Sequence, residues 1–549
     1  MLRSGDLLLL AMIPFKLSQS SYATNLSPSI TVERGAYRMR APYANPVGRT
    51  LFSSAATPNR RPERPTPILM SNLAMLVVLL AFASISCFGM AYYLFVTRWD
   101  ARAPSVRPSA NQHLQVVPVE SFSPQIPGGP DEKFLAYLPH SGFHNQRIAF
   151  ENSLVLARLL NRTLLAPPIR LATKPLHYLK FDALYHTIAL SNKLGLRHCS
   201  QVPLHIPLPL ECADYSEYTH ISWDWLMNLT EVKRRQRIFQ RWNMTHAWIQ
   251  DRLGVTDADT LTIKDSSIYQ YRFLDTTADV SPPDHKFIES LYISHLAACT
   301  KRLIQVGTLF GSSRLRLKNK ANVSLRSTIR QSMNFSNPML VDAARSIAQS
   351  LGFQYIGVHL RVTDGQFRTL RKHNVRMVWQ NVMHVLKYSP EQVESLERIF
   401  HNQSKVTALA DFGGTGVDLS LARRRQPRAY RMRCREPIYV DPGLEQLNTP
   451  LYISTDAKES EKTMLFSIFH ETFPCIFYAS DFPGAIAPLM NIRNSDDDIP
   501  LGGFLLPFLD AMVLGYAKTV VGTNGSTFTR FVQDVLWRTY HGEAVMERG

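Results

Sequence analysis

The stretch FLAYLPHSGFHNQRIAFENSLVLARLLNRTLLAPP, residues 134–168, contains the pattern that decides the fold. Its first apolar run, 134–140, predicts a buried strand, and the periodicity of residues 145–160 predicts a helix. A second apolar run, 163–168, predicts another strand, which ends at two prolines that cannot continue it. This order of strand, helix and strand predicts a parallel sheet with helices on its faces.

The same alternation returns in the second half of the chain. The predicted strands there are 355–361, 450–456, 474–481 and 519–523, and the predicted helices are 458–472, 503–517 and 526–540. Two α/β halves with a cleft between them are the simplest architecture. The middle of the chain, roughly 200–335, is irregular and rich in Trp, and we make no detailed prediction for it.

Composition bounds the class of protein. The 549 residues are 45% hydrophobic and 10% aromatic, which is enough for a packed core and excludes wholesale disorder. Six cysteines without a C-x-x-C pair argue against a disulfide miniprotein and a zinc ribbon. Of the net charge of +17, residues 1–72 contribute nine Lys or Arg and three Asp or Glu, which leaves +11 for the rest. That surplus suits a phosphate site or a polyanion and does not separate nucleic acid from a nucleotide-sugar.

One apolar segment suits a membrane span. Residues 73–96, LAMLVVLLAFASISCFGMAYYLFV, contain no charge, and about 20 apolar residues are enough to cross a bilayer. Tyr92, Tyr93 and Trp99 fit an aromatic belt at its downstream end. We therefore expect one transmembrane helix, placed at residues 69–97.

Glycosylation acceptors indicate the orientation of this span, because arginines flank it on both sides. Only Asn25 starts an N-x-S/T sequon upstream. Seven sequons follow downstream, at Asn161, Asn228, Asn243, Asn322, Asn334, Asn402 and Asn524. We expect a single-pass type II protein of the secretory pathway, in the Golgi or endoplasmic reticulum. Residues 1–68 are then a disordered, basic cytosolic tail, and the proline-rich residues 98–130 are a stem.

Polar residues follow the first predicted strand, where open α/β sheets bind ligands and a helix N-terminus attracts anions. Gly142 allows close approach of the backbone, and Asn145 supplies both a donor and an acceptor. Phe143 and His144 lie between them. A turn in which Asn145 caps the helix is the structural alternative, and these residues alone do not decide between the two.

A second group ends the predicted strand 355–361. Alternation places His359 and Arg361 on one face of the strand and Leu360 on the other. An arginine at the end of a buried strand is costly unless it meets an anion, and a guanidinium can hold a diphosphate through two parallel bonds. The structural alternative is a salt bridge from Arg361 to Asp364 or another core carboxylate.

A third group surrounds the last predicted strand. Asp510 lies on the helix before this strand, and Thr527 and Phe528 lie at the entry to the helix after it. The hydroxyls of Ser526 and Thr527 suit either a helix cap or a phosphate site.

Two further features are interpreted as structural. Residues 496–498 are three aspartates, which would suit a metal but are more typical of a solvated loop. Residues 404–436 contain three glycines and, between 423 and 435, seven arginines. We interpret this segment as a solvated insertion, with an anion-binding loop as the alternative.

Together these motifs resemble those of one family, the GDP-fucose protein O-fucosyltransferases. GFHNQRIAFENSLVLARLLNRTLLAPP (142–168) is similar to their N-terminal signature, HLR (359–361) to their H-x-R strand, and DAMVLGYAKTVVGTNGSTFTRF (510–531) to their C-terminal signature. These blocks cover less than a fifth of the chain, and the two outer ones are specific. Residues 200–335 and 400–440 show no match that we recognise.

The resemblance implies a GT-B-like α/β fold with two Rossmann-type parallel-sheet domains that face a cleft, preceded by the transmembrane helix. Residues 131–350 would form the acceptor-side domain, and residues 351–549 the domain that binds GDP-fucose. It also implies a membrane-anchored inverting glycosyltransferase, which moves fucose from GDP-fucose to a hydroxyl acceptor. GDP-fucose would be the donor substrate, and no cofactor and no obligatory metal are implied.

The resemblance assigns roles to individual residues. Arg361 would bind the β-phosphate and neutralise the charge of the departing GDP, and Asn145 would lie near the reacting centre. The catalytic residues that it implies are Arg361, Asn145 and His144. The substrate-binding residues are Gly142, Phe143, His144, Asn145, His359, Leu360, Arg361, Asp510, Thr527 and Phe528.

The sequence departs from the family pattern at two places. Ser141 stands where some members have a glutamate base, which leaves open whether His144, His140 or no side chain acts as the base. Asn524 stands where some relatives have a cysteine, so we expect no matching disulfide there. Cys199 and Cys212, 13 residues apart, are candidates for a disulfide; Cys299, Cys434 and Cys475 stay unassigned.

The expected acceptor is a Ser or Thr hydroxyl of a protein. One alternative is a glycan acceptor, as in α1,6-type fucosyltransferases, whose H-x-R strand is similar. Another is a non-catalytic relative that binds the nucleotide-sugar without transfer. We expect no nucleic-acid partner, because no groove-reading motif is present and the body is expected to be lumenal.

Overall fold

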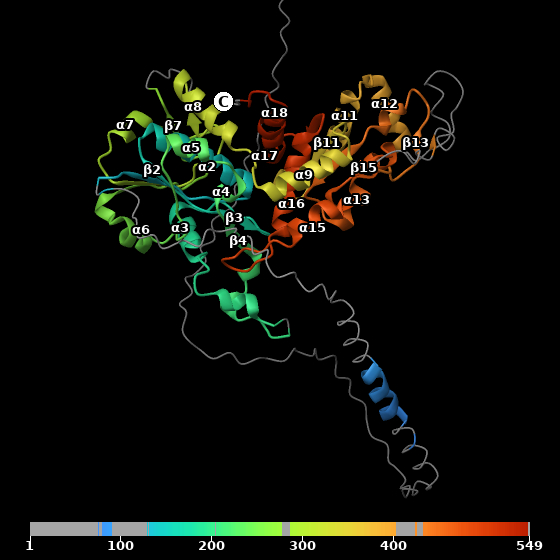
Figure 1. Cartoon of the computed structure of the whole chain (residues 1–549), viewed down its shortest axis with the longest axis horizontal. Coiled ribbons are helices and arrows are strands. Elements are labelled where there is room, and N and C mark those ends of the chain that lie inside the picture. The colour runs from blue at the N-terminus through green and yellow to red at the C-terminus, as the bar shows by residue number, and fades with distance from the viewer. Residues whose placement is uncertain are drawn as a thin grey trace, which may run out of the picture. The chain divides into compact units, whose positions relative to one another are not determined.

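The computed structural model describes residues 75, 79–90, 129, 131–203, 205–276, 286–401, 423–424 and 432–546. The chain separates into two compact units, residues 1–107 and 108–549. All named strands and their covering helices belong to the second unit (Figure 1).

The predicted membrane span is described only in part. Met75 and residues 79–90 are helical, and the rest of 69–97 lies outside the described residues, as do 1–68 and nearly all of the predicted stem. None of the helices that the structure describes is both long and apolar enough to cross a bilayer. The span therefore stays a prediction.

The first sheet has five parallel strands in the order β5-β2-β1-β9-β6. They are β1 (Phe134–Ala136), β2 (Thr163–Ala166), β5 (Ile238–Gln240), β6 (Thr260–Ile263) and β9 (Leu303–Val306). Helix α2 (Phe143–Leu159) connects β1 to β2 and packs on both strands. The parallel sheet and the helix predicted from residues 134–168 are confirmed, although β1 is shorter than predicted.

The second sheet has four parallel strands in the order β15-β14-β11-β16. They are β11 (Ile356–Leu360), β14 (Leu451–Thr455), β15 (Ile476–Phe477) and β16 (Thr519–Gly522). Helix α16 (Gly502–Tyr516) packs against β11 and β14, and α11 (Arg371–Val385) against β11 and β16. All four strands fall within the predicted runs.

The remaining elements surround these two sheets. The other strands are β3 (Ile169–Ala172), β4 (Tyr218–Ile221), β7 (Tyr271–Leu274), β8 (Glu289–Tyr292), β10 (Leu315–Arg316), β12 (Arg423–Arg424) and β13 (Ile438–Tyr439). The helices up to residue 350 are α3 (Phe181–Leu190), α4 (Trp223–Leu226), α5 (Thr230–Arg235), α6 (His246–Leu253), α7 (Ile293–Ala297), α8 (Lys320–Ser332) and α9 (Pro338–Ser350). Those beyond it are α10 (Gly365–Thr369), α12 (Pro390–His401), α13 (Glu459–Leu465), α14 (Ser467–Thr472), α15 (Pro483–Met490), α17 (Thr527–Phe531) and α18 (Trp537–Tyr540), the last two joined by a π-helical turn.

One hydrophobic core contains residues from both parts of the second unit. It joins Leu135 and Ile304 of the first sheet to Leu509 and Val513 of α16. Helices α9 and α16 also pack along each other (Figure 1). The two larger sheets come from either side of residue 350, but the division into domains at that residue stays a prediction.

Two disulfides lie within the described residues. Cys199 pairs with Cys212, as predicted, and Cys434 pairs with Cys475, which the sequence did not assign. The second bridge fixes the chain that follows residue 431 to the start of β15.

Gly522 allows helix α17 to approach the second sheet. A Cβ atom added at this residue would lie 2.7 Å from Cγ2 and 2.8 Å from Oγ1 of Thr529, and 3.2 Å from Cβ of His359. Only a residue without a side chain leaves room for α17 to pack so closely on β11 and β16.

Replacing Gly522 with Ala should therefore destabilise the fold by about 1–3 kcal/mol, the usual cost of overpacking a core. Urea unfolding followed by circular dichroism measures this. Gly503→Ala is the matched control, because Gly503 is an exposed helical residue whose added Cβ meets nothing within 4 Å. That change should stabilise by about 0.5–1 kcal/mol. Equal effects of the two substitutions would contradict the close-approach argument.

Candidate functional site

The N-terminal turn of α2 is fixed by backbone geometry and by one amide. Gly142 is the N-cap residue, with extended backbone and no capping side chain, so Asn145 is not the cap. Ser141 before it has a φ of 66°, in the left-handed region. Gln146 donates to the carbonyls of Ser141 (3.1 Å) and Arg170 (2.8 Å) and accepts from the Arg170 N–H. The turn is therefore held rigidly against β3.

The ring of His144 packs against helix α17. Its ring centroid lies 4.9 Å from that of Phe528 and 5.3 Å from that of Phe531. Its Nδ1 is buried and has no hydrogen-bond partner among the described residues. Burial first, and then the positive charges of Arg147 and Arg361, hold the pKa of His144 well below its ordinary value. The imidazole is therefore neutral near physiological pH.

His359 also packs on Phe528. The two rings are stacked, with centroids 4.3 Å apart, and Nδ1 of His359 forms a 2.7 Å hydrogen bond with Oγ1 of Thr529. Burial, helped by Arg361, lowers the pKa of His359 to about 3. The structure thus brings together His144, His359 and Phe528, which the sequence placed in three separate motifs.

Arg361 follows β11 at its carboxyl end. Its side chain is 34% exposed and pairs with Asp364 (2.6 Å, Nη2 to Oδ2) and Asp456 (3.1 Å, Nε to Oδ2). Burial alone would lower the pKa of Arg361, but the two carboxylates outweigh it and raise that pKa. The salt bridge to Asp364 that the sequence suggested as the alternative is present. Nη1 forms no hydrogen bond to another described residue.

Asp510 lies on α16 beneath the second sheet. Its carboxylate accepts from the Tyr452 hydroxyl (2.6 Å) and the Ser454 hydroxyl (3.0 Å). Ser454 is the register partner of His359, so both residues belong to the same face of the sheet. Burial raises the pKa of Asp510 to about 6, although both hydrogen bonds oppose this shift.

The hydroxyl groups near α17 form different hydrogen bonds. Ser526 caps the helix by accepting from the Thr529 N–H, so Thr527, the first helical residue, is not the cap. Oγ1 of Thr523 accepts from the Arg361 N–H at 3.0 Å. The sequence missed Thr523, Thr529 and Asp456. Thr523 and Asp456 end predicted strands, where a polar residue is a signal, whereas Thr529 lies within the predicted helix 526–540 and carried no such signal.

Three of the predicted substrate-binding residues, Leu360, Phe143 and Asn145, differ from one another in burial and in contacts. Leu360 is fully buried in the core on the other face of β11, and its role in binding substrate stays a prediction. The ring of Phe143 packs on Phe508 (4.6 Å) and Phe335, which gives it a core contact that the sequence did not predict. Asn145 is half-buried on the turn that bears His144, and its role stays a prediction.

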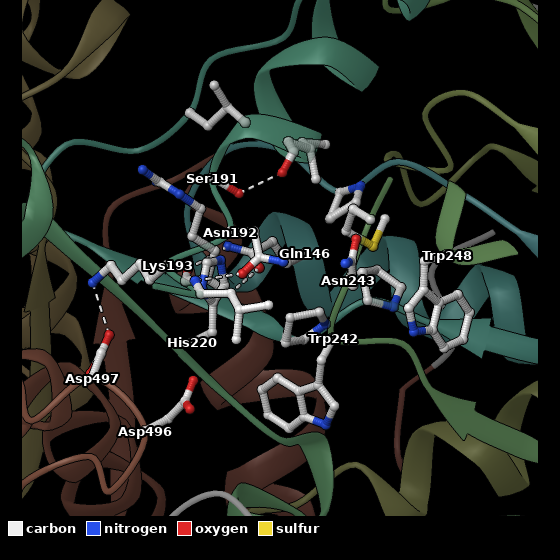
Figure 2. A pocket seen from close by; sticks show the side chains of 18 of the residues that line it. Gln146, Ser191, Asn192, Lys193, His220, Trp242, Asn243, Trp248, Asp496 and Asp497 are labelled. Atoms are coloured by element: carbon white, nitrogen blue, oxygen red, sulfur yellow. Dashed lines mark hydrogen bonds and ion pairs between the residues drawn. The ribbon is translucent and has the colours of Figure 1, made fainter. Parts of the chain in front are cut away.

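A cavity of about 580 Å³ opens beside this site, near the carboxyl ends of β1, β2 and β5 (Figure 2). Ser141 and Gln146 belong to its lining, so it adjoins the N-terminal turn of α2. Its lining does not include Arg361 or His359. The residues that line the cavity are therefore distinct from Arg361 and His359, the candidates for binding phosphate.

One interpretation of polar residues near the cavity needs correction. Asp497 is not solvated: it is 3% exposed, and its Oδ2 pairs with Nζ of Lys193 at 2.8 Å. His140 is also buried, and its two ring nitrogens bond to the hydroxyls of Ser141 and Thr308, each at 2.7 Å. Burial lowers the pKa of His140 to about 4, and whether His144, His140 or no side chain acts as the base stays a prediction.

Comparison with known proteins adds three findings. The family model described as "GDP-fucose protein O-fucosyltransferase" matches residues 134–539. "O-fucosyltransferase 30" of Arabidopsis thaliana is 60% identical over 38 residues, which are 7% of this chain and 8% of that relative's length. Crystal structures of POFUT1 with GDP-fucose and with GDP are each 12% identical and cover 76% of this chain and 97% of theirs, with TM-scores of 0.31 and 0.32.

The raised pKa of Asp510 predicts a pH dependence of stability. The folded protein holds this proton up to about pH 6, whereas the unfolded chain releases it near pH 3.8. Wild type should therefore lose stability relative to Asp510→Asn as the pH rises through this window, by up to about 3 kcal/mol. Urea unfolding of both proteins at several pH values measures the difference, with the exposed Asp251→Asn as control. Wild type that keeps or gains stability relative to Asp510→Asn across this window would contradict the shift.

Proposed function

Because the chain belongs to the GDP-fucose protein O-fucosyltransferase family, we propose that it transfers fucose from GDP-fucose to a hydroxyl group of an acceptor. The observation that carries this proposal is the meeting of two strand ends. The turn after β1 presents His144, the chain after β11 presents Arg361, and Phe528 packs on both His144 and His359. Ligands of open α/β sheets bind at such carboxyl ends.

The donor diphosphate would bind at Arg361. The guanidinium and its two carboxylates carry a net charge of −1, so phosphate must displace one of them. Asp364 is 57% exposed and loses little when it turns to water, whereas Asp456 also accepts from the Val362 N–H and the Thr363 hydroxyl. Arg361 would therefore exchange Asp364 for phosphate, with Asp456 holding the guanidinium in place.

The reaction would be a single displacement with inversion. The bond between the anomeric carbon and the β-phosphate oxygen breaks, the acceptor oxygen forms the new bond, and the hydroxyl proton departs. Negative charge accumulates on GDP, where Arg361 would stabilise it. Thr527 and Phe528 would hold the nucleotide, and Asp510 would contact it. We propose no metal for this step and no further cofactor.

The family description names protein hydroxyls as acceptors. A glycan hydroxyl is the second candidate, and the cavity beside α2 favours it, as argued below. A relative that binds GDP-fucose without transfer is distinguished by whether it releases GDP when an acceptor is present.

We also propose the GT-B arrangement and the membrane anchor. Two Rossmann-like parallel sheets support the first. Two disulfides among the described residues support an oxidising compartment, together with the sequons downstream of residues 69–97. The chain would then be a type II protein of the Golgi or endoplasmic reticulum, anchored by that segment.

Removing the Arg361 side chain should weaken binding of GDP-fucose by about 100-fold and abolish transfer, because a charged donor to phosphate is lost. Calorimetric titration with GDP-fucose, GDP-mannose and UDP-glucose measures affinity and selectivity. Arg376→Ala is the matched control, since Arg376 is an exposed arginine paired with Glu397 on α12. Unchanged affinity in Arg361→Ala would remove the phosphate role.

The lowered pKa of His144 predicts the shape of the pH–rate profile. A neutral imidazole accepts a proton at any pH above its own pKa, so kcat/KM should show no inflection from His144 between about pH 6 and about pH 8. Initial rates across this range test it. An inflection near pH 6.5 that disappears in His144→Gln would show that the imidazole titrates and is more exposed than described.

A further inference from the structure

The cavity beside α2 is built for a polar ligand with flat apolar faces. Figure 2 shows Trp242 and Trp248 on one side of it, Asp496 and Asp497 on the other, and the amides of Asn192 and Asn243 between them. Its volume of about 580 Å³ falls among pockets that enclose small ligands, roughly 300–1,000 Å³. A folded acceptor domain cannot enter a space of this size.

Trp242 contributes an aromatic surface to this cavity. Within the described residues no other ring stacks on it and no cation lies over it, whereas Trp248 is contacted by Phe239 (5.8 Å) and by the guanidinium of Arg241 (5.7 Å). A half-buried indole that lines a cavity offers a broad flat contact. Sugar rings present C–H faces that match such a surface.

Polar groups that can form further hydrogen bonds lie near that indole in the lining of the cavity. Asn192 uses its carbonyl to accept from the Leu194 N–H at 2.8 Å, which leaves its NH₂ as a donor. The Asp496 carboxylate has no hydrogen bond or ion pair to another described residue, because neighbouring Lys193 is already paired with Asp497. A donor and a charged acceptor beside an aromatic face are the groups that bind ring hydroxyls.

The floor of the cavity is fixed. Nζ of Lys193 also donates to the Tyr215 carbonyl (2.7 Å), and the Thr219 hydroxyl donates to Asp497 (2.9 Å). These buried bonds join the chain around residue 193 to the loop that bears Asp496. The binding groups are thus preorganised, which lowers the entropic cost of holding a ligand.

We infer that this cavity binds a carbohydrate portion of the acceptor, with its ring on Trp242 and its hydroxyls on Asn192 and Asp496. The inference rests on the proposed transfer from GDP-fucose, and it specifies the acceptor as a glycan. A sugar held there adjoins Ser141 and Gln146, and therefore lies beside the turn that bears Asn145 and His144.

The test uses the purified full chain and a panel of labelled di- to tetrasaccharides built from hexoses, N-acetylglucosamine and uronic acids. Binding is measured by saturation-transfer NMR with GDP present, and transfer is measured with radiolabelled GDP-fucose. A serine/threonine peptide and a folded EGF-like domain form the protein arm. We expect at least one saccharide to bind and to accept fucose.

Trp242→Ala and Asp496→Asn should each raise KM for that saccharide about tenfold, and Trp242→Phe should restore most of the loss, because a flat ring is retained. The affinity for GDP-fucose should not change. Asp251→Asn, an exposed acid on α6 outside the lining, is the matched control.

Four outcomes decide the inference. Saccharide binding that disappears in Trp242→Ala supports it, and it does so even if GDP-fucose fails to bind, in which case only the transfer function falls. No saccharide binding by a chain that binds GDP-fucose overturns it, as does transfer to the protein arm alone. A glycan on Asn243, which begins an N-M-T sequon, would fill the cavity from within; its detection by mass spectrometry would also overturn the inference.

Discussion

The structure depends on the contact between the N-terminal turns of α2 and the helix that follows β16. His144 meets Phe528 and Phe531 there, and the guanidinium of Arg147 lies 4.4 Å above the ring of Phe531. Arg147 is buried and pairs with Glu151, which also binds Arg330 of α8. A buried charge without a partner costs several kcal/mol. The ion pair between Glu151 and Arg330 therefore holds α2 against α8. The contact joins α2, which follows the first strand of one sheet, to α17, which follows the last strand of the other.

This contact turns two separate strand ends into one site. Gly522 lets α17 approach β11 closely enough for Thr529 to bind His359. Phe528 is thereby placed in contact with both His359 and His144. Arg361 emerges beside them, and Asp456 holds the guanidinium from the next strand. A nucleotide-sugar bound there would touch both sheets, while the cavity on the far side of the α2 turn is left for the acceptor.

Sequence patterns predicted the elements whose residues are apolar in a regular period. The strands of the second sheet and helices α2 and α16 were found because their apolar residues follow such a period. Strands β5, β6 and β9 were missed, since they are short and lie in the irregular stretch 200–335. Leu360 was assigned to the substrate through its motif, although alternation alone already placed it in the core. The cavity could not have been predicted, because Trp242, Asn192 and Asp496 are separated by up to 304 residues and meet only through folding.

Hydrogen–deuterium exchange of the full chain with and without GDP-fucose tests the central claim most directly, because it shows where the donor binds. Binding at the meeting point of the two strand ends predicts slower exchange in residues 361–366 and 523–530 and in the first turn of α2. It predicts little change in residues 191–197 and 494–498, which border the cavity. Protection confined to the cavity segments, or none at saturating GDP-fucose, would contradict this assignment of the donor site.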